Sequence, residues 1–345
     1  MVDGIGSGDV EVPWGVGVAT GIGSLPYDDR DEAVKMVVGE LPDLPHLPEL
    51  PGRGAGADMI GRAAAMLVDM HVDLQPSGWR LVDRPGRDER RAGEMLRADL
   101  DAMEIAAHGY EGPLKVQVTG PWTLAAALDR TRGDRVLADY GARRDLAHSL
   151  AEGLAEHVAE VAGRLPGARV VAQVDEPGLP AVLAGSIPTS SGFGRLRAVQ
   201  AAEAESLLAA VFAAAGEWPV LHCCAGDVPV ALARRAGAGA VSLDVGRLDD
   251  TVVGELAEAV DDGLMLWPGV VPTVAPVSPP SDSHLAERVV RLCRRLDQNP
   301  ARLAAGLVVT PACGLAGADP WWSRRAYALA RGTARAFAES VGADQ

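Results

Sequence analysis

Lysine is nearly absent from this chain of 345 residues, because Lys35 and Lys115 are the only lysines among its 32 basic residues. Chemistry that forms a Schiff base on a lysine therefore has two candidate residues at most. The formal net charge is −15, with 47 acidic residues against the 32 basic ones. A surface this acidic repels phosphate backbones, so we do not expect nucleic acid as a partner.

Long apolar runs and cysteines are also scarce. No apolar run approaches the roughly 18 residues that a membrane helix needs, so we expect no membrane partner. The first residues lack the basic start and the apolar core of a secretory signal. Four cysteines are present, without paired CxxC motifs. These features favour a reduced, cytoplasmic protein whose cysteines are thiols or metal ligands.

Short β-branched runs alternate with longer helical patterns along the chain. An eighth strand is expected between residues 26 and 113, either at 44–50 or at 70–75. The alternation indicates a parallel sheet, and seven or eight such units predict an α/β fold of the (β/α)₈ TIM-barrel type. We assign residues 1–14 to an amino-terminal extension and residues 15–345 to one catalytic domain. The seven clearest strand runs are 15–24, 114–120, 169–175, 219–223, 239–244, 263–271 and 306–313.

Polar residues follow the ends of most of these predicted strands. In a parallel barrel the carboxyl ends of all strands face one mouth, which is where catalytic groups collect. Residues that are scattered over the sequence can therefore meet there. The residues in question are Ser24, Thr119, Asp175, His222, Cys224, Asp244 and Cys313.

Four of these residues together form a possible zinc site. His222 and Cys224 stand two positions apart, on the same side of an extended segment. Cys313 and Asp244 follow two other strands. Zinc accepts nitrogen, sulfur and oxygen ligands in tetrahedral geometry. The alternative is a buried histidine among buried cysteines of the core. We assign Cys293 to such packing, and Cys223 either to the core or to the surroundings of the metal ligands.

Two thiolate ligands make zinc a weak activator of water, because sulfur donates electron density to the metal. Such a site is better suited to hold an incoming thiol as a thiolate. A thiolate at neutral pH is a nucleophile for alkyl transfer. The residues alone thus predict a thiol alkyltransferase, with a zinc hydrolase as the weaker alternative. Motifs of other enzyme classes, such as GxSxG and GxxxxGK[ST], are missing.

Six short motifs carry a resemblance to a known family. They occur in family order over about residues 15–330, and they resemble the carboxyl-terminal catalytic barrel of cobalamin-independent methionine synthase. The resemblance implies that zinc binds homocysteine as a thiolate, which attacks an activated methyl group to give methionine. The motifs are GIGSLP at 21–26, VTGPWTL at 118–124, QVDEPGL at 173–179, HCC at 222–224, VSLDVGR at 241–247 and CGL at 313–315.

The resemblance also implies the roles of single residues. His222, Cys224 and Cys313 match the zinc ligands and are the expected catalytic residues, while Asp244 stands where the family usually has a ligating glutamate. The expected substrate-binding residues are four. Gly23 and Ser24 match the segment whose backbone holds the amino-acid carboxylate, Asp175 matches the acid that binds the ammonium group, and Glu49 is a looser match to a second such acid.

The folate side of the family site is not matched. The family stacks the pterin on a tryptophan shortly after VTGP, where this chain has alanines and where Trp122 stands in a different register. An Asp-Ile-His near 268–271 is also missing. The full-length family enzyme has two barrels, whereas this chain has the length of one. The methyl donor is therefore open between methyltetrahydrofolate and a methylcorrinoid, which a separate protein could carry.

Two further functions stay open at this point. One is a zinc alkyltransferase that acts on another small thiol. The other is a non-catalytic barrel that binds zinc or a corrinoid. A decarboxylase of a porphyrin-like substrate would share the barrel, but it would leave the histidine and cysteine set unexplained.

Overall fold

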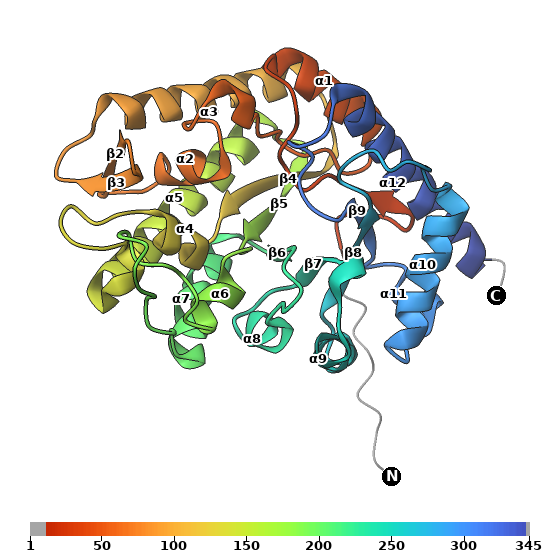
Figure 1. Cartoon of the computed structure of the whole chain (residues 1–345). Coiled ribbons are helices and arrows are strands. Elements are labelled where there is room, and N and C mark those ends of the chain that lie inside the picture. The colour runs from red at the N-terminus through yellow and green to blue at the C-terminus, as the bar shows by residue number, and fades with distance from the viewer. Residues whose placement is uncertain (1–11, 343–345) are drawn as a thin grey trace, which may run out of the picture.

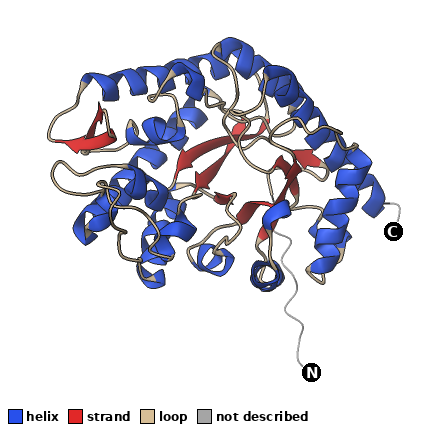
Figure 2. Cartoon of the chain, viewed as in Figure 1, coloured by secondary structure: helices blue, strands red, loops and turns tan. Residues whose placement is uncertain are grey.

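The computed structural model describes residues 12–342, which form a curled sheet of parallel strands surrounded by helices (Figures 1 and 2). Within these residues the main sheet has seven strands in the order β1-β9-β8-β7-β6-β5-β4. Each strand lies in or beside a run predicted as strand, so the expected alternation is confirmed. The strands are β1 (Val18–Ala19), β4 (Gly112–Thr119), β5 (Ala168–Asp175), β6 (Val220–Cys223), β7 (Ala240–Asp244), β8 (Met265–Val271) and β9 (Val308–Pro311).

The segment 44–50 closes the ring between β1 and β4. Backbone hydrogen bonds of 2.9 and 3.1 Å join Glu49 to the chain after β1, and bonds of 2.8 and 2.9 Å join Pro45 and Leu47 to Lys115 of β4. Two prolines in the segment lack an N–H group, which limits the pairing to isolated bridges. The segment nevertheless takes the place of the eighth strand. It is the first of the two candidates that the sequence analysis proposed for this strand. The (β/α)₈ class is thereby confirmed.

The other candidate, around residues 70–75, lies outside the barrel. It forms β2 (His71–Gln75), which pairs in antiparallel register with β3 (Gly78–Val82). This hairpin stands at the left of Figure 1, apart from the ring of strands.

Helices cover the outside of the barrel (Figure 2). The first and last helices, α1 and α12, lie side by side (Figure 1). The helices are α1 (Arg30–Glu40), α2 (Met59–Ala64), α3 (Arg87–Ala106), α4 (Pro121–Ala127), α5 (Tyr140–Arg164), α6 (Leu179–Leu183), α7 (Ala201–Ala214), α8 (Val230–Arg235), α9 (Asp250–Asp261), α10 (Asp282–Arg295), α11 (Pro300–Leu303) and α12 (Pro320–Gly342), with 3₁₀ turns η1 (Pro51–Arg53), η2 (Val136–Ala138) and η3 (Val245–Arg247).

The barrel interior changes from apolar to polar along its axis. Because side chains alternate along a strand, residues two positions apart face the same side. Near the amino ends of the strands the interior holds a buried apolar cluster that includes Val171, Val220, Ala240, Trp267 and Val308. Two residues further along four of these strands stand buried polar residues, namely Gln173, His222, Ser242 and Thr310. The interior of the carboxyl half of the barrel is thus lined by polar side chains.

The chain before β1 covers the amino end of the barrel. Trp14, which falls in the predicted extension, is buried and packs edge to face on Trp267 with ring centroids 5.4 Å apart. The carbonyl of Pro13 accepts a hydrogen bond of 3.0 Å from Arg169. The rest of the predicted extension, residues 1–11, lies outside the described residues. None of the helices in the described part of the chain combines the length and apolar character that crossing a bilayer requires.

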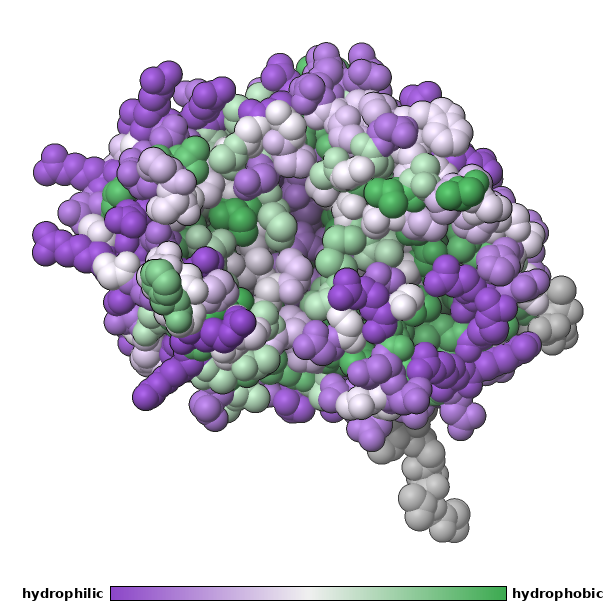
Figure 3. All heavy atoms as spheres, in the orientation of Figure 1, coloured by the Kyte–Doolittle hydropathy of each residue, from purple (hydrophilic) through white to green (hydrophobic). Residues whose placement is uncertain are grey.

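The outer surface is mostly hydrophilic on the face seen in Figure 3, and apolar side chains are exposed there in separate patches. The same face is hollowed near its centre.

Candidate active site

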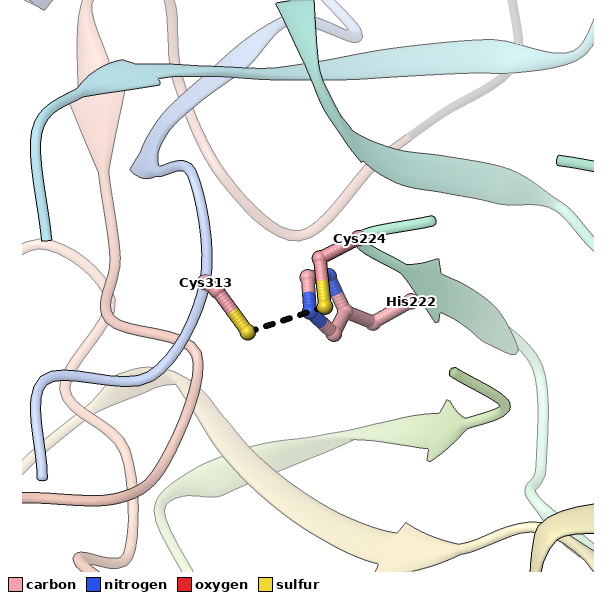
Figure 4. A group of neighbouring side chains, drawn as sticks. All are labelled: His222, Cys224 and Cys313. Atoms are coloured by element: carbon pink, nitrogen blue, oxygen red, sulfur yellow. Dashed lines mark hydrogen bonds between the residues drawn. The ribbon is translucent and has the colours of Figure 1, made fainter. Parts of the chain in front are cut away.

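Three side chains from two distant parts of the sequence meet at the carboxyl end of the barrel (Figure 4). His222 lies in β6, Cys224 follows that strand, and Cys313 follows β9. Their ligand atoms all lie within 4.8 Å of one another. Figure 4 shows the imidazole and both sulfurs directed toward one another across the site. These are three of the four residues that the sequence predicted as zinc ligands.

His222 presents one free ring nitrogen to this group. Its Nδ1 lies 3.1 Å from the hydroxyl of Ser242 on β7, and its Nε2 is buried with no hydrogen-bond partner among residues 12–342. A histidine that binds a metal usually hydrogen-bonds through its other ring nitrogen, which fixes the orientation of the ring. A buried, unpartnered nitrogen beside two sulfurs therefore fits a zinc site with nitrogen and sulfur ligands.

The two sulfurs of the site already interact. The Cys313 thiol donates a hydrogen bond of 3.0 Å to the Cys224 sulfur. This bond, helped by the neighbouring His222, lowers the pKa of the Cys224 thiol well below its ordinary value, and it raises the pKa of Cys313. In contrast, burial raises the pKa of Cys223 to about 12 and that of Cys293 to about 11. Both lie buried, in β6 and α10, as expected for packing residues.

Asp244 ends β7 at the same mouth but lies outside this group. Its Oδ1 accepts a hydrogen bond of 2.8 Å from the N–H of Gly246 and begins the turn η3. Among the described residues, the set of ligand atoms within 4.8 Å of one another does not include it. Its role as a zinc ligand stays a prediction that rests on the resemblance.

Gly23 and Ser24 form the turn after β1. The Gly23 carbonyl accepts a hydrogen bond of 3.1 Å from the N–H of Glu49, and the Ser24 carbonyl accepts one of 2.8 Å from the N–H of Leu315. The N–H groups of Gly23 and Ser24 themselves have no acceptor within residues 12–342. Two successive unpaired N–H groups can bind a carboxylate.

Two buried carboxylates stand beside this turn and the three ligands. Asp175 ends β5 and pairs in register with His222, and Glu49 forms a bridge with Ser24. Burial raises the pKa of both carboxyls, that of Asp175 to about 7, and the charge of Glu49 contributes to the rise at Asp175. A cation bound next to such carboxylates restores their charged form. The ammonium group of an amino acid is such a cation.

Four polar residues that support these groups were not singled out as site residues from the sequence. Gln173 donates a hydrogen bond of 2.7 Å to Asp175. The Nε of Arg62 lies 3.8 Å from Oε1 of Glu49. For Lys115, Gln117 and Gln173 the available signal was a polar residue at every second position of an otherwise apolar strand, which marks the side that faces the barrel interior. Arg62 lies in the helix α2, where this signal does not apply. The four residues are Arg62, Lys115, Gln117 and Gln173.

Two residues of the predicted motifs have structural roles. The Glu176 carboxylate accepts hydrogen bonds of 2.8 Å from the N–H groups of Trp122 and Thr123, so it caps the first turn of α4. Trp122 is buried, and its Nε1 donates to the carbonyl of Ala204 over 3.1 Å. Its indole is thus part of the core and does not offer a face for stacking a pterin.

Gly314 allows the loop after β9 to approach the turn after β1. A Cβ atom at this position would overlap the hydroxyl of Ser24. We expect Gly314→Ala to lower the free energy of unfolding by about 0.5–1.5 kcal/mol, because the Ser24 hydroxyl must rotate away while its Cβ stays 3.3 Å from the added methyl group. Denaturation by urea would measure the loss.

The matched variants for this prediction are Gly317→Ala and the double variant Gly314→Ala/Ser24→Ala. A Cβ at Gly317 meets nothing within 4 Å, so this variant should keep its stability. The double variant removes the hydroxyl and should regain most of the loss. Equal stability of Gly314→Ala and Gly317→Ala would contradict the close contact.

A family model described as "Cobalamin-independent synthase, Catalytic domain" matches residues 18–336. The chain belongs to this family. The match runs from β1 to α12, so it covers the whole barrel and both parts of the site. It confirms the resemblance inferred from the six motifs. The family is one of methyltransferases, the methionine synthases that work without cobalamin.

Comparison with solved structures agrees with the fold of this synthase family. The chain is similar to a B12-independent methionine synthase from Shewanella sp. W3-18-1, solved in complex with selenomethionine, with a TM-score of 0.61 at 13% identity. The alignment covers 95% of this chain and 98% of that one. SrfJ from Salmonella typhimurium aligns with a TM-score of 0.41 at 9% identity, over 87% of this chain and 66% of that one. A search of curated proteins gives no match.

Proposed function

We propose that this chain is a zinc-dependent methyltransferase that methylates the sulfur of homocysteine to form methionine. The observation that carries the proposal is the set of ligand atoms of His222, Cys224 and Cys313 within 4.8 Å of one another, next to the buried carboxylates of Asp175 and Glu49. A metal-binding group thus stands beside groups that suit an amino acid. Membership in the synthase family supports the same activity.

We infer that zinc is the metal of this site. His222, Cys224 and Cys313 would hold it, and Asp244 is the proposed fourth ligand. The donor set of one imidazole and two sulfurs is one that zinc prefers. When bound, zinc would lower the pKa of the substrate thiol and keep it as a thiolate at neutral pH.

The residues away from the sulfurs would hold the amino-acid end of homocysteine. Asp175 and Glu49 would bind its ammonium group, and the N–H groups of Gly23 and Ser24 would bind its carboxylate. Two anchors beyond the sulfur fix the direction of the thiol before the donor arrives. Such fixed orientation lowers the entropic part of the barrier to methyl transfer.

The proposed methyl donors are methyltetrahydrofolate and a methylcorrinoid. A pterin would need a stacking partner other than Trp122, because that indole is buried in the core. Assays of methionine formation with each donor would identify the one that the enzyme uses.

X-ray absorption at the zinc edge, on purified zinc-loaded protein, tests the proposal. We expect two sulfurs around zinc without substrate and three after addition of homocysteine. An unchanged shell, or a protein that does not retain zinc, would instead indicate a binding or structural role. If 2-mercaptoethanesulfonate supplies the third sulfur at a lower concentration than homocysteine does, the protein is an alkyltransferase for a different thiol.

A further inference from the structure

Lys115 is a buried cation that the proposed reaction does not yet use. Its side chain lies inside the barrel, on β4, and is fully buried. Its Nζ donates hydrogen bonds of 2.8 Å to the carbonyl of Ile22 and 3.2 Å to Oε1 of Gln117. Burial lowers the pKa of this ammonium group to about 8. A buried ammonium group is costly to the fold, so its retention suggests a specific task.

The carbonyl of Ile22 accepts a second buried hydrogen bond. Nε2 of Gln173, on β5, donates to it over 2.9 Å. Two neighbouring strands therefore hold the same peptide carbonyl through side chains that are themselves buried. This carbonyl belongs to the peptide bond that joins Ile22 to Gly23.

The direction of that carbonyl determines the direction of the next N–H group. A trans peptide unit is planar, and its C=O and N–H groups point in opposite directions. No cis peptide bond occurs in the described chain. With the Ile22 carbonyl directed toward Lys115 and Gln173, the N–H of Gly23 points away from them. The carbonyls of Gly23 and Ser24 are held by Glu49 and the loop after β9, so the whole turn is fixed through its acceptors.

We propose that Lys115 is a positioning residue for the substrate carboxylate, because it holds the Ile22–Gly23 peptide so that the Gly23 N–H is free to bind that carboxylate. The enzyme thereby selects thiols that carry an α-carboxylate. The inference rests on the proposed function, since homocysteine supplies this group. A different task, as a counter-charge for Asp175 and Glu49, would affect the ammonium end of the substrate instead.

Three thiols separate these two tasks. The first is L-homocysteine, the second is 3-aminopropane-1-thiol, which lacks the carboxylate, and the third is 4-mercaptobutanoate, which lacks the ammonium group. Their dissociation constants would be measured by calorimetry on zinc-loaded wild type and on zinc-loaded Lys115→Met. The matched control is Lys35→Met, because Lys35 is the other lysine and lies exposed on α1.

We expect wild type and Lys35→Met to prefer homocysteine over the aminothiol by about 100-fold, which is the effect of one charged group that is well paired. In Lys115→Met this preference should fall below about 10-fold, while the preference over 4-mercaptobutanoate stays unchanged. Equal loss of affinity for all three thiols would overturn the inference in favour of a structural role. Loss of the preference over 4-mercaptobutanoate would overturn it in favour of the counter-charge.

Lys115→Gln covers the case in which the methionine variant does not fold. Its amide keeps an N–H donor without the charge, so it should retain more of the preference for a carboxylate than methionine does. A glutamine variant that keeps the carboxylate preference but loses the ammonium preference would contradict the inference. If wild type does not bind homocysteine, the proposed function fails, and this inference fails with it. If wild type binds it but folded Lys115→Met keeps its full carboxylate preference, only this inference fails.

Discussion

Replacement of Cys313 by serine is expected to abolish both metal retention and methyl transfer. The hydroxyl is a poor substitute for a thiolate toward zinc, and the two ligands that remain of the three-residue group come from a single strand end. Bound zinc should fall from about one atom per chain to less than about 0.1, and turnover should fall by about 1,000-fold or more. Elemental analysis after dialysis and an assay of methionine formation measure the two effects.

Cys293→Ala is the matched control for this variant. Cys293 is buried in α10, among residues that pack that helix against the barrel. Its loss should cost some stability and leave the zinc content unchanged. Circular dichroism should show a folded barrel for both variants. Cys313→Ser protein that keeps its zinc and its turnover would remove Cys313 from the site.

Asp175→Asn should raise the KM for homocysteine by about 100-fold or more. The neutral amide removes one of the two carboxylates proposed to bind the substrate ammonium in a buried pocket, and such a loss amounts to about 2–3 kcal/mol. The effect should be specific for the ammonium group. Binding of 4-mercaptobutanoate, which lacks that group, should be nearly the same in the variant and in wild type.

Glu176→Gln provides the comparison within the same motif. Glu176 is also a buried carboxyl whose pKa burial raises to about 7, but it caps α4 instead of facing the substrate groups. This variant should lose stability in urea and keep its affinity for homocysteine. If the two variants lower the affinity for homocysteine equally, Asp175 does not bind the ammonium group.

The strands could be predicted because parallel strands are buried on both faces and therefore read as apolar runs. β8, inside the run 263–271, is an example. The closing segment 44–50 could not be chosen with the same certainty. Pro45 and Pro48 interrupt its pattern, and its place follows only from the backbone bonds to Lys115 and to the turn after β1.

The candidate ligands could be predicted because their residue types are chemically distinctive and they stand where strands end. His222, Cys224 and Cys313 are such residues. The position of Lys115 was a weaker indication of function, since this residue stands in the middle of a strand between apolar neighbours. Its importance depends on the Ile22 carbonyl, which lies 93 residues away in sequence, and no local pattern reveals that contact.

The position of β1 in the sheet has a consequence for the order of events during synthesis. In the seven-stranded sheet β1 pairs only with β9, and Cys313 follows β9. A growing chain that has already made His222 and Cys224 holds one nitrogen and one sulfur ligand, while its first strand still lacks its partner. Because domains fold as units as they leave the ribosome, metal loading should be a late step. The proposed zinc would be bound after translation of β9, when Cys313 is present and the barrel has closed.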